Sequence, residues 1–179
     1  EPLAPTLNDF SNSEILEKLD GYYVSIKQDS RYGIIITSRG SFDNKYTQAV
    51  KDHFLNKKAL LPDYTYFCEL LMDFAGDEGI IVTKHPTPNL VCWALKDPNG
   101  LEIPITSQTI FPVAKRFGVS SYRSYLERQV EGVVVHDLGT NRRVKIKTEW
   151  YVKMHRLISD CTPKRVWEIL VEGKRVEDY

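Results

Sequence analysis

The chain has 179 residues, of which 42% are apolar and 27% charged, so it can form a core and disorder is not expected. This length fits a single domain. The 24 basic and 24 acidic residues cancel, which argues against a histone-like protein held to nucleic acid by bulk charge but leaves room for a local basic groove.

The first half of the chain has the pattern of short strands around one helix. Residues 1–13 are rich in Pro, Ser and Asn and predict a loop. A hairpin is predicted over 22–26 and 32–37, with Tyr22, Val24 and Ile26 on one face. A helical pattern covers 48–60. Four more strands are predicted, at 64–71, 79–83, 90–95 and 101–105, with a turn at 97–100.

The second half mixes helices and strands. Helices are predicted over 112–117 and 120–129, and strands over 130–136 and 142–147, which flank a turn at 138–141. Two helices close the chain. The first has apolar residues at helical spacing from Trp150 to Ile158, and the second begins at Thr162 and Pro163. The hairpins favour antiparallel pairing, and therefore an α+β fold.

Lysines in two places have spacings that suit phosphate chemistry. Lys18 begins the run Lys18-Leu19-Asp20-Gly21 before the first hairpin. A lone lysine there is ordinarily a solvated side chain, but a lysine beside other cations loses its proton more readily and becomes a nucleophile. Lys145 and Lys147 share one face of a predicted strand, either as guards of an edge strand or as a clamp for phosphate.

Two carboxylates stand in otherwise apolar strands. Glu69 lies in 66–71, and Glu131 precedes Gly132 and three valines. A charge in such a strand either faces solvent or has a partner. As functional groups, one carboxylate would bind the hydroxyls of a nucleoside and the other a divalent metal. Arg39, which ends the first hairpin, on its own is consistent with an ordinary turn.

The order of these motifs is more specific than any one of them. The chain contains, in sequence, K-x-D-G from Lys18, S-R-G-S-F around Arg39, F-x-E ending at Glu69, E-G at Glu131 and K-x-K from Lys145 to Lys147. This order resembles the covalent nucleotidyltransferase superfamily, which contains ATP-dependent RNA and DNA ligases and mRNA capping enzymes. The resemblance is strongest to the RNA ligases of the T-even phage tRNA-repair type.

The resemblance implies an ATP-dependent reaction. Lys18 would attack the α-phosphorus of ATP and become lysyl-AMP, AMP would pass to the 5′-phosphate of an RNA end, and a 3′-hydroxyl would then seal the strand. Lys145 and Lys147 would hold the phosphate. Glu69 would hold the ribose hydroxyls, and Glu131 would support a divalent metal, Mg²⁺ or Mn²⁺.

Further positions follow from the same resemblance. Arg39 would lie near the ribose or the phosphates, and Asp20 and Gly21 would shape the turn beside the nucleophile. The adenine base needs an apolar slot. Its expected walls are Leu16, Leu19, Val133 and Ile146. The three tryptophans, Trp93, Trp150 and Trp167, are expected to pack in the core, with stacking on RNA bases as the alternative.

The resemblance implies an α+β nucleotidyltransferase fold with mostly antiparallel sheets and flanking helices. Residues 1–179 are expected to form a single such domain that lacks flanking regions of a longer ligase. Two alternatives remain open: a capping-type guanylyltransferase, and a catalytically impaired relative that binds nucleotide or RNA.

The sequence also predicts a compartment. Its three cysteines are widely spaced and form no C-x-x-C pair, which suits reduced thiols. No apolar run approaches the ~20 residues of a spanning helix, and the first residues do not resemble a signal peptide. We therefore expect a cytoplasmic protein without a membrane partner, in the host cytoplasm if the source is viral.

Overall fold

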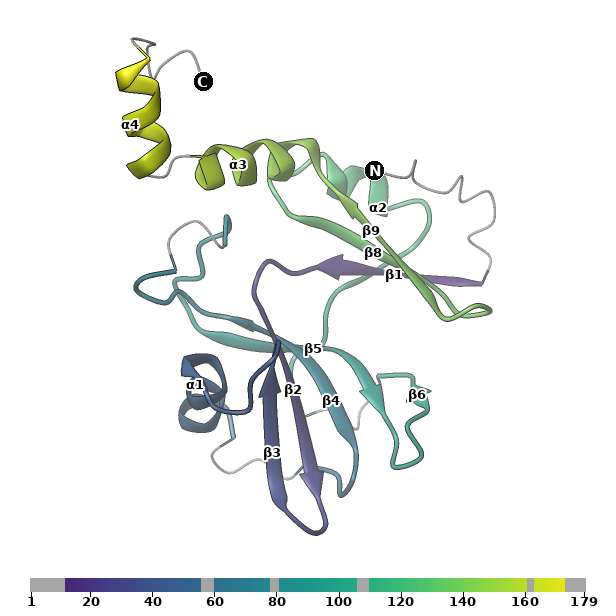
Figure 1. The fold of residues 1–179 in the computed structure, drawn as a ribbon. Helices are drawn as coiled ribbons and strands as arrows, with labels where there is room; N and C mark the ends of the chain where they lie inside the picture. The colour runs from purple at the N-terminus through teal and green to yellow at the C-terminus, as the bar shows by residue number, and fades with distance from the viewer. Residues whose placement is uncertain (1–11, 56–59, 78–80, 106–109, 161–162, 173–179) are drawn as a thin grey trace.

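The computed structural model describes residues 12–55, 60–77, 81–105, 110–160 and 163–172. They form two antiparallel sheets flanked by helices (Figure 1). Residues of both sheets line the cavity described below. The strand order is β7-β1-β8-β9 in the smaller sheet and β3-β2-β4-β5-β6 in the larger one. The α+β prediction is therefore confirmed.

The larger sheet carries the main core on one face. Its elements are β2 (Tyr22–Asp29), β3 (Gly33–Ser38), β4 (Thr65–Leu71), β5 (Asn89–Lys96) and β6 (Glu102–Ile103), with α1 (Lys45–His53) packed beside it. Side chains alternate along these strands, so Tyr22, Val24 and Ile26 are buried as predicted, together with Val50 of α1. Tyr23 of β2 and Glu69 of β4, which alternate with these buried residues, instead line the cavity.

The smaller sheet has its own, smaller core. Its elements are β1 (Ser13–Lys18), β7 (Arg116–Phe117), β8 (Gly132–Asp137) and β9 (Arg142–Lys147), and the helices are α2 (Tyr122–Leu126), α3 (Glu149–Asp160) and α4 (Pro163–Val171). Ile15, Val133 and Val135 are buried against Tyr122 and Tyr125 of α2. Among the described residues, none of the helices has the length and apolar content needed to cross a membrane.

The chain passes from one sheet to the other directly after Lys18. Strand β1 belongs to the smaller sheet and β2 to the larger one, and only residues 19–21 separate them. The side chains at the end of β1 therefore lie at the junction of the two sheets. This crossing is what positions the candidate site.

Several predicted elements differ from the structure. Residues 112–117 are not helical, because Arg116 and Phe117 pair with β1 and Val113 bridges to Cys92. The predicted loop over 1–13 lies outside the described residues up to 11. The strand β1 that follows it was not predicted. Of the strand predicted at 79–83, residues 79–80 lie outside the described part, and the remainder has one bridge and a bend.

Three further predictions have the right kind of element with wrong bounds. Helix α1 begins at Lys45 because Asn44 caps it, accepting hydrogen bonds from the backbone of Tyr46 and Thr47. It ends at His53, although the pattern extended to 60. The helix expected over 120–129 is the single short segment of α2, and the strand expected over 101–105 is limited to β6.

Candidate active site

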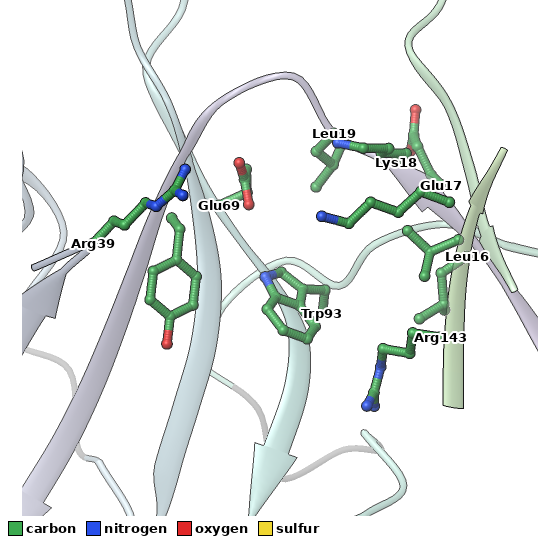
Figure 2. Close-up of a pocket in the computed structure, with 11 residues that line it drawn as sticks. Leu16, Glu17, Lys18, Leu19, Arg39, Glu69, Trp93 and Arg143 are labelled. Atoms are coloured by element: carbon green, nitrogen blue, oxygen red, sulfur yellow. The ribbon is translucent and has the colours of Figure 1, made fainter. Parts of the chain in front are cut away.

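A cavity of about 480 Å³ lies between the two sheets (Figure 2). The larger sheet and the end of β3 contribute Tyr23, Arg39, Glu69 and Trp93. The smaller sheet and the segment after β1 contribute Leu16, Glu17, Lys18, Leu19, Val134, Arg143 and Lys145. In Figure 2, Arg39, Glu69 and Trp93 face Leu16, Lys18 and Arg143 across the open space. Four of the predicted site residues therefore line one cavity.

Lys18 and Glu131 form a close ion pair beside this cavity. The Nζ of Lys18 lies 2.6 Å from Oε1 of Glu131, and the Nζ of Lys147 lies 3.5 Å from the same oxygen. The side chain of Glu131 is 4% exposed and that of Lys18 is 17% exposed. Burial raises the pKa of Glu131, and the hydrogen bond and charge of Lys18 oppose this rise.

Strand register explains why these three residues meet. Gly132 of β8 pairs with Lys18 of β1 on one side and with Lys147 of β9 on the other. Glu131 is the residue just before Gly132, so its side chain reaches both lysines. A Cβ at Gly132 would lie 1.9 Å from the carbonyl oxygen of Ile146, and its φ is +147°. Only glycine allows this close approach of β8 and β9.

Glu69 is the second carboxylate of the cavity. It lies on β4 opposite Tyr23 of β2. Burial raises the pKa of Glu69 to about 7; the charge of Lys18 opposes this rise, whereas Glu131 and Asp20 add to it. A carboxyl group that titrates near neutrality can both donate and accept hydrogen bonds, which suits the binding of sugar hydroxyls.

Asp20 and Gly21 hold the crossing between the sheets. The carboxylate of Asp20 accepts hydrogen bonds from the backbone N–H groups of Val82 and Thr83, at 2.8 and 2.7 Å, and from the hydroxyl of Tyr151 at 2.8 Å. A Cβ at Gly21 would lie 2.7 Å from the carbonyl oxygen of Leu70 and 2.8 Å from Glu69 Cγ. These two residues therefore shape the path of the chain and do not line the cavity.

The remaining predicted cations lie at the periphery. Arg39 is exposed at the end of β3 and Lys145 is exposed on β9, and both line the cavity. Lys147 is exposed outside the lining and reaches the site through Glu131. Ile146 between the two lysines packs against the smaller core. The two lysines thus share a face, as their spacing predicted.

Two of the four predicted apolar walls are wrong. Leu16 and Leu19 line the cavity, but Val133 and Ile146 lie in the smaller core. Strand alternation turns Val134, next to Val133, into the cavity instead. The strand predicted over 130–136 is present, but the face that was expected to line the cavity is the one that packs in the smaller core.

Trp93 and Arg143 are cavity residues that the sequence did not identify. Trp93 was expected in the core, yet it lines the cavity beside Tyr23 and Phe67, with ring centroids 6.4 and 5.7 Å away. Arg143 lies over its ring at 5.9 Å. The face of Trp93 follows from strand pairing: Val91 pairs with Glu69, and Trp93 lies two residues after Val91 on the same strand. The sequence alone does not reveal this, because the register of β4 and β5 must be known first.

The resemblance implies a divalent metal, and one side chain near this site, that of Glu131, could be its ligand. Within the described residues, no three His, Cys, Asp or Glu side chains are arranged as a metal site. Mg²⁺ is usually held by one or two carboxylates together with substrate phosphates and water. Glu131 lies behind Lys18, outside the lining of the cavity, and its carboxylate could serve as the one protein ligand of a metal that arrives with a phosphorylated substrate.

Solved RNA ligase structures have a similar fold. One form of an archaeal ATP-dependent RNA ligase has a TM-score of 0.60 and 16% identity, over 78% of this chain and 43% of that chain. A second form has a TM-score of 0.59 and 15% identity, over 90% and 50%. A variant of the Naegleria gruberi RNA ligase with ATP and Mn has a TM-score of 0.53 and 13% identity, over 87% and 56%.

These likenesses concern structure, and the chain spans about half the length of the ligases it matches. No protein-family model and no curated protein sequence matches the chain. Mostly antiparallel sheets with flanking helices were expected from the sequence, and the structure has them. The described residues therefore have the α+β nucleotidyltransferase fold found in structures of ATP-dependent RNA ligases.

Proposed function

We propose that this chain is an ATP-dependent RNA ligase, or the adenylyltransferase part of one, with Lys18 as the nucleophile. One observation carries the proposal: the Nζ of Lys18 lies 2.6 Å from the buried carboxylate of Glu131, at a cavity that also contains Glu69, Arg39 and Lys145. A lysine, a proton acceptor and several cations around one cavity suit attack on a phosphate ester. Likeness to RNA ligase structures supports the same conclusion.

The first step would join Lys18 to AMP. The neutral amine of Lys18 attacks the α-phosphorus of ATP, an N–P bond forms, and the P–O bond to pyrophosphate breaks with its electron pair leaving on oxygen. The proton that Lys18 must lose has an acceptor in Oε1 of Glu131. Because burial raises the pKa of Glu131, this carboxylate accepts a proton more readily than an exposed one.

The other cavity residues would bind and orient ATP. Lys145 and Lys147 neutralise the phosphates, and Arg39 contacts the ribose or phosphates from the opposite rim. Glu69 accepts hydrogen bonds from the ribose hydroxyls, and Trp93 offers an aromatic face for the base. A bound Mg²⁺ or Mn²⁺ would supply additional positive charge to the phosphates, with Glu131 as its protein ligand.

The later steps would use RNA. A 5′-phosphate oxygen attacks the phosphorus of lysyl-AMP and releases Lys18. A 3′-hydroxyl then attacks the activated 5′-phosphate, forms the phosphodiester and releases AMP. RNA with 5′-phosphate and 3′-hydroxyl ends is therefore the proposed partner.

Transfer of label from α-labelled ATP in the presence of Mg²⁺ or Mn²⁺, followed by denaturing electrophoresis, tests the first step. We expect acid-labile label on the protein and none on Lys18→Ala. Lys18→Arg is the matched control, because it keeps a cation beside Glu131 but stays protonated at neutral pH. It should also remain unlabelled, whereas Lys51→Ala, an exposed lysine on α1, should label normally.

Three results would contradict this proposal. Label on Lys18→Arg would place the nucleophile elsewhere. Label from GTP in place of ATP would identify a capping-type guanylyltransferase. Absence of label from both, with the protein folded and still binding ATP, would identify a nucleotide-binding relative without the covalent step.

A further inference from the structure

A second pocket, distinct from the cavity, lies beside β7 and α2. It has a volume of about 230 Å³ and is lined by three cations, Lys115, Arg116 and Arg128, together with the hydroxyls of Ser121 and Ser124. All five of these residues are exposed. A small pocket with three cations and no carboxylate in its lining has the charge of a phosphate site.

The cations of this pocket are mostly free to bind an anion. Within the described residues, Arg116 lies 3.6 Å from Glu14, but neither Lys115 nor Arg128 has a carboxylate within ion-pair distance. Lys115 is held over two aromatic rings, with its Nζ 5.1 Å from the ring centroid of Phe117 and 6.0 Å from that of Tyr125. This ammonium group is therefore positioned before any ligand arrives.

The surrounding segment is basic in a neutral chain. Residues 113–130 contain four basic residues and one acidic residue, although the whole chain has a net charge of zero. The excess of positive charge in this segment attracts anionic ligands and so raises their concentration near the pocket. It supplies the local basic surface that the overall charge balance left open.

The pocket adjoins the candidate active site through Glu17. The backbone N–H of Glu17 donates to the carbonyl of Lys115 at 2.8 Å, and the hydroxyl of Tyr125 donates to Oε1 of Glu17 at 2.5 Å. Glu17 also lines the cavity, and Lys18 is the next residue of β1. An RNA strand with its reacting end at Lys18 would reach the pocket by passing around β7, the edge strand of the smaller sheet.

We propose that this pocket, which we name the β7–α2 pocket, binds a backbone phosphate of the RNA strand whose end reacts at Lys18. This inference rests on the proposed function. Lys115 and Arg128 make the charged contacts with the phosphate oxygens. The hydroxyls of Ser121 and Ser124 donate to the carbonyls of Gly118 and Ser121, at 3.1 and 2.9 Å, and only line the pocket. Since the charged contacts involve only the RNA backbone, the pocket fixes the position of the strand and not its sequence.

Fluorescence anisotropy of a 3′-labelled, 5′-phosphorylated single-stranded RNA of 12 nucleotides tests the pocket without ATP. The full chain is compared with Lys115→Ala/Arg128→Ala over a series of salt concentrations. Loss of two phosphate contacts should lower the salt slope of log K by about 1.4 and weaken binding about tenfold at 0.1 M salt. Lys51→Ala/Arg31→Ala, which removes one exposed cation from α1 and one from the turn between β2 and β3, is the matched control.

Transfer of label from ATP to Lys18 is measured on the same preparations, because that step involves no RNA. Weaker RNA binding with a smaller slope, unchanged labelling and normal binding by Lys115→Arg/Arg128→Lys would support the pocket. RNA binding and slope equal to those of the control pair would overturn it. Absence of labelling in the unaltered chain would instead overturn the proposed function, so the two failures are distinguishable.

Discussion

At the scale of single residues, the burial of Glu69 has a consequence for stability. Its pKa is raised from 4.5 to about 7, so between these values the folded chain holds a proton that the unfolded chain has lost. Stability contributed by the protonated carboxyl is therefore present at acid pH and lost as pH rises toward 8. We expect Glu69→Gln, which cannot ionise, to be more stable than the unaltered chain by about 1–3 kcal/mol at pH 8.

Urea unfolding at pH 5 and pH 8 measures this effect. The two proteins should be nearly equal at pH 5 and should separate at pH 8, with the same m-value. Asp137→Asn is the comparison, because hydrogen bonds from Thr140 and Gly139 lower the pKa of Asp137, whereas burial raises that of Glu69. The stability of the two variants relative to the unaltered chain should therefore change with pH in opposite directions. A stability gap for Glu69→Gln that does not grow with pH would mean that Glu69 is already ionised in the folded chain at pH 5.

At the scale of elements, Gly132 sets the spacing of three strands. A methyl group there would collide with the backbone of Ile146 at 1.9 Å, and the backbone itself is in a region that suits glycine. We expect Gly132→Ala to reduce the free energy of unfolding by at least about 3 kcal/mol, because both strain and overpacking contribute. It should also separate Lys18 and Lys147 from Glu131 and so abolish labelling from ATP.

Gly100→Ala is the control for this substitution. Gly100 has a φ of +81°, but no atom lies within 4 Å of the position of a new Cβ. Its cost should be limited to backbone strain of about 1–2 kcal/mol, with labelling intact. Equal effects of the two substitutions in thermal and urea unfolding would show that strand spacing at Gly132 is not under steric control.

Elements with a strong local pattern were predicted from sequence, and those fixed by distant partners were not. Alternation in 22–26 and the turn at 97–100 are local signals, and both are confirmed. Residues 112–117 lack a local preference strong enough to resist pairing, and β1 provides an edge for Arg116 and Phe117. The strand β1 itself follows a loop-like composition, and its pairing with β8 spans more than 100 positions along the chain.

The same distinction applies to the site. Lys18 and Glu69 were candidates because their motifs are short and ordered along the chain, and the structure places both at the cavity. Trp93 and Arg143 carry no motif, and they reach the cavity only because two sheets face one another. Which residue of a strand faces the cavity depends on register, as Val133 and Val134 show. Motifs therefore predicted charged groups better than apolar walls.

At the scale of the whole molecule, an ion pair between Arg143 and Glu102 connects the two sheets beside the cavity. Arg143 of β9 donates to the carboxylate of Glu102 on β6, and its guanidinium also lies over Trp93. The side chains of the pair are 25% and 22% exposed, so the interaction is screened less than a surface pair. Nδ1 of His136 on β8 also lies 4.0 Å from the carboxylate of Glu102. Because Glu102 contacts two side chains of the smaller sheet, we expect this cluster to help to fix the width of the cavity.

A double-mutant cycle on Arg143→Ala and Glu102→Ala measures the connection. We expect a coupling free energy of about 1 kcal/mol in urea unfolding, because each single change removes the closest charged partner of a partly buried group. The exposed pair Lys164–Glu168 on α4, at 3.9 Å, is the control and should couple by less than about 0.5 kcal/mol.

If the width of the cavity depends on the pair Arg143–Glu102, Arg143→Ala should also weaken ATP binding. Glu102→Ala should weaken ATP binding to a similar extent, although Glu102 does not line the cavity. Additive stabilities, or a loss of ATP binding confined to Arg143→Ala, would show that Arg143 acts on the ligand alone and that the sheets keep their separation without the pair.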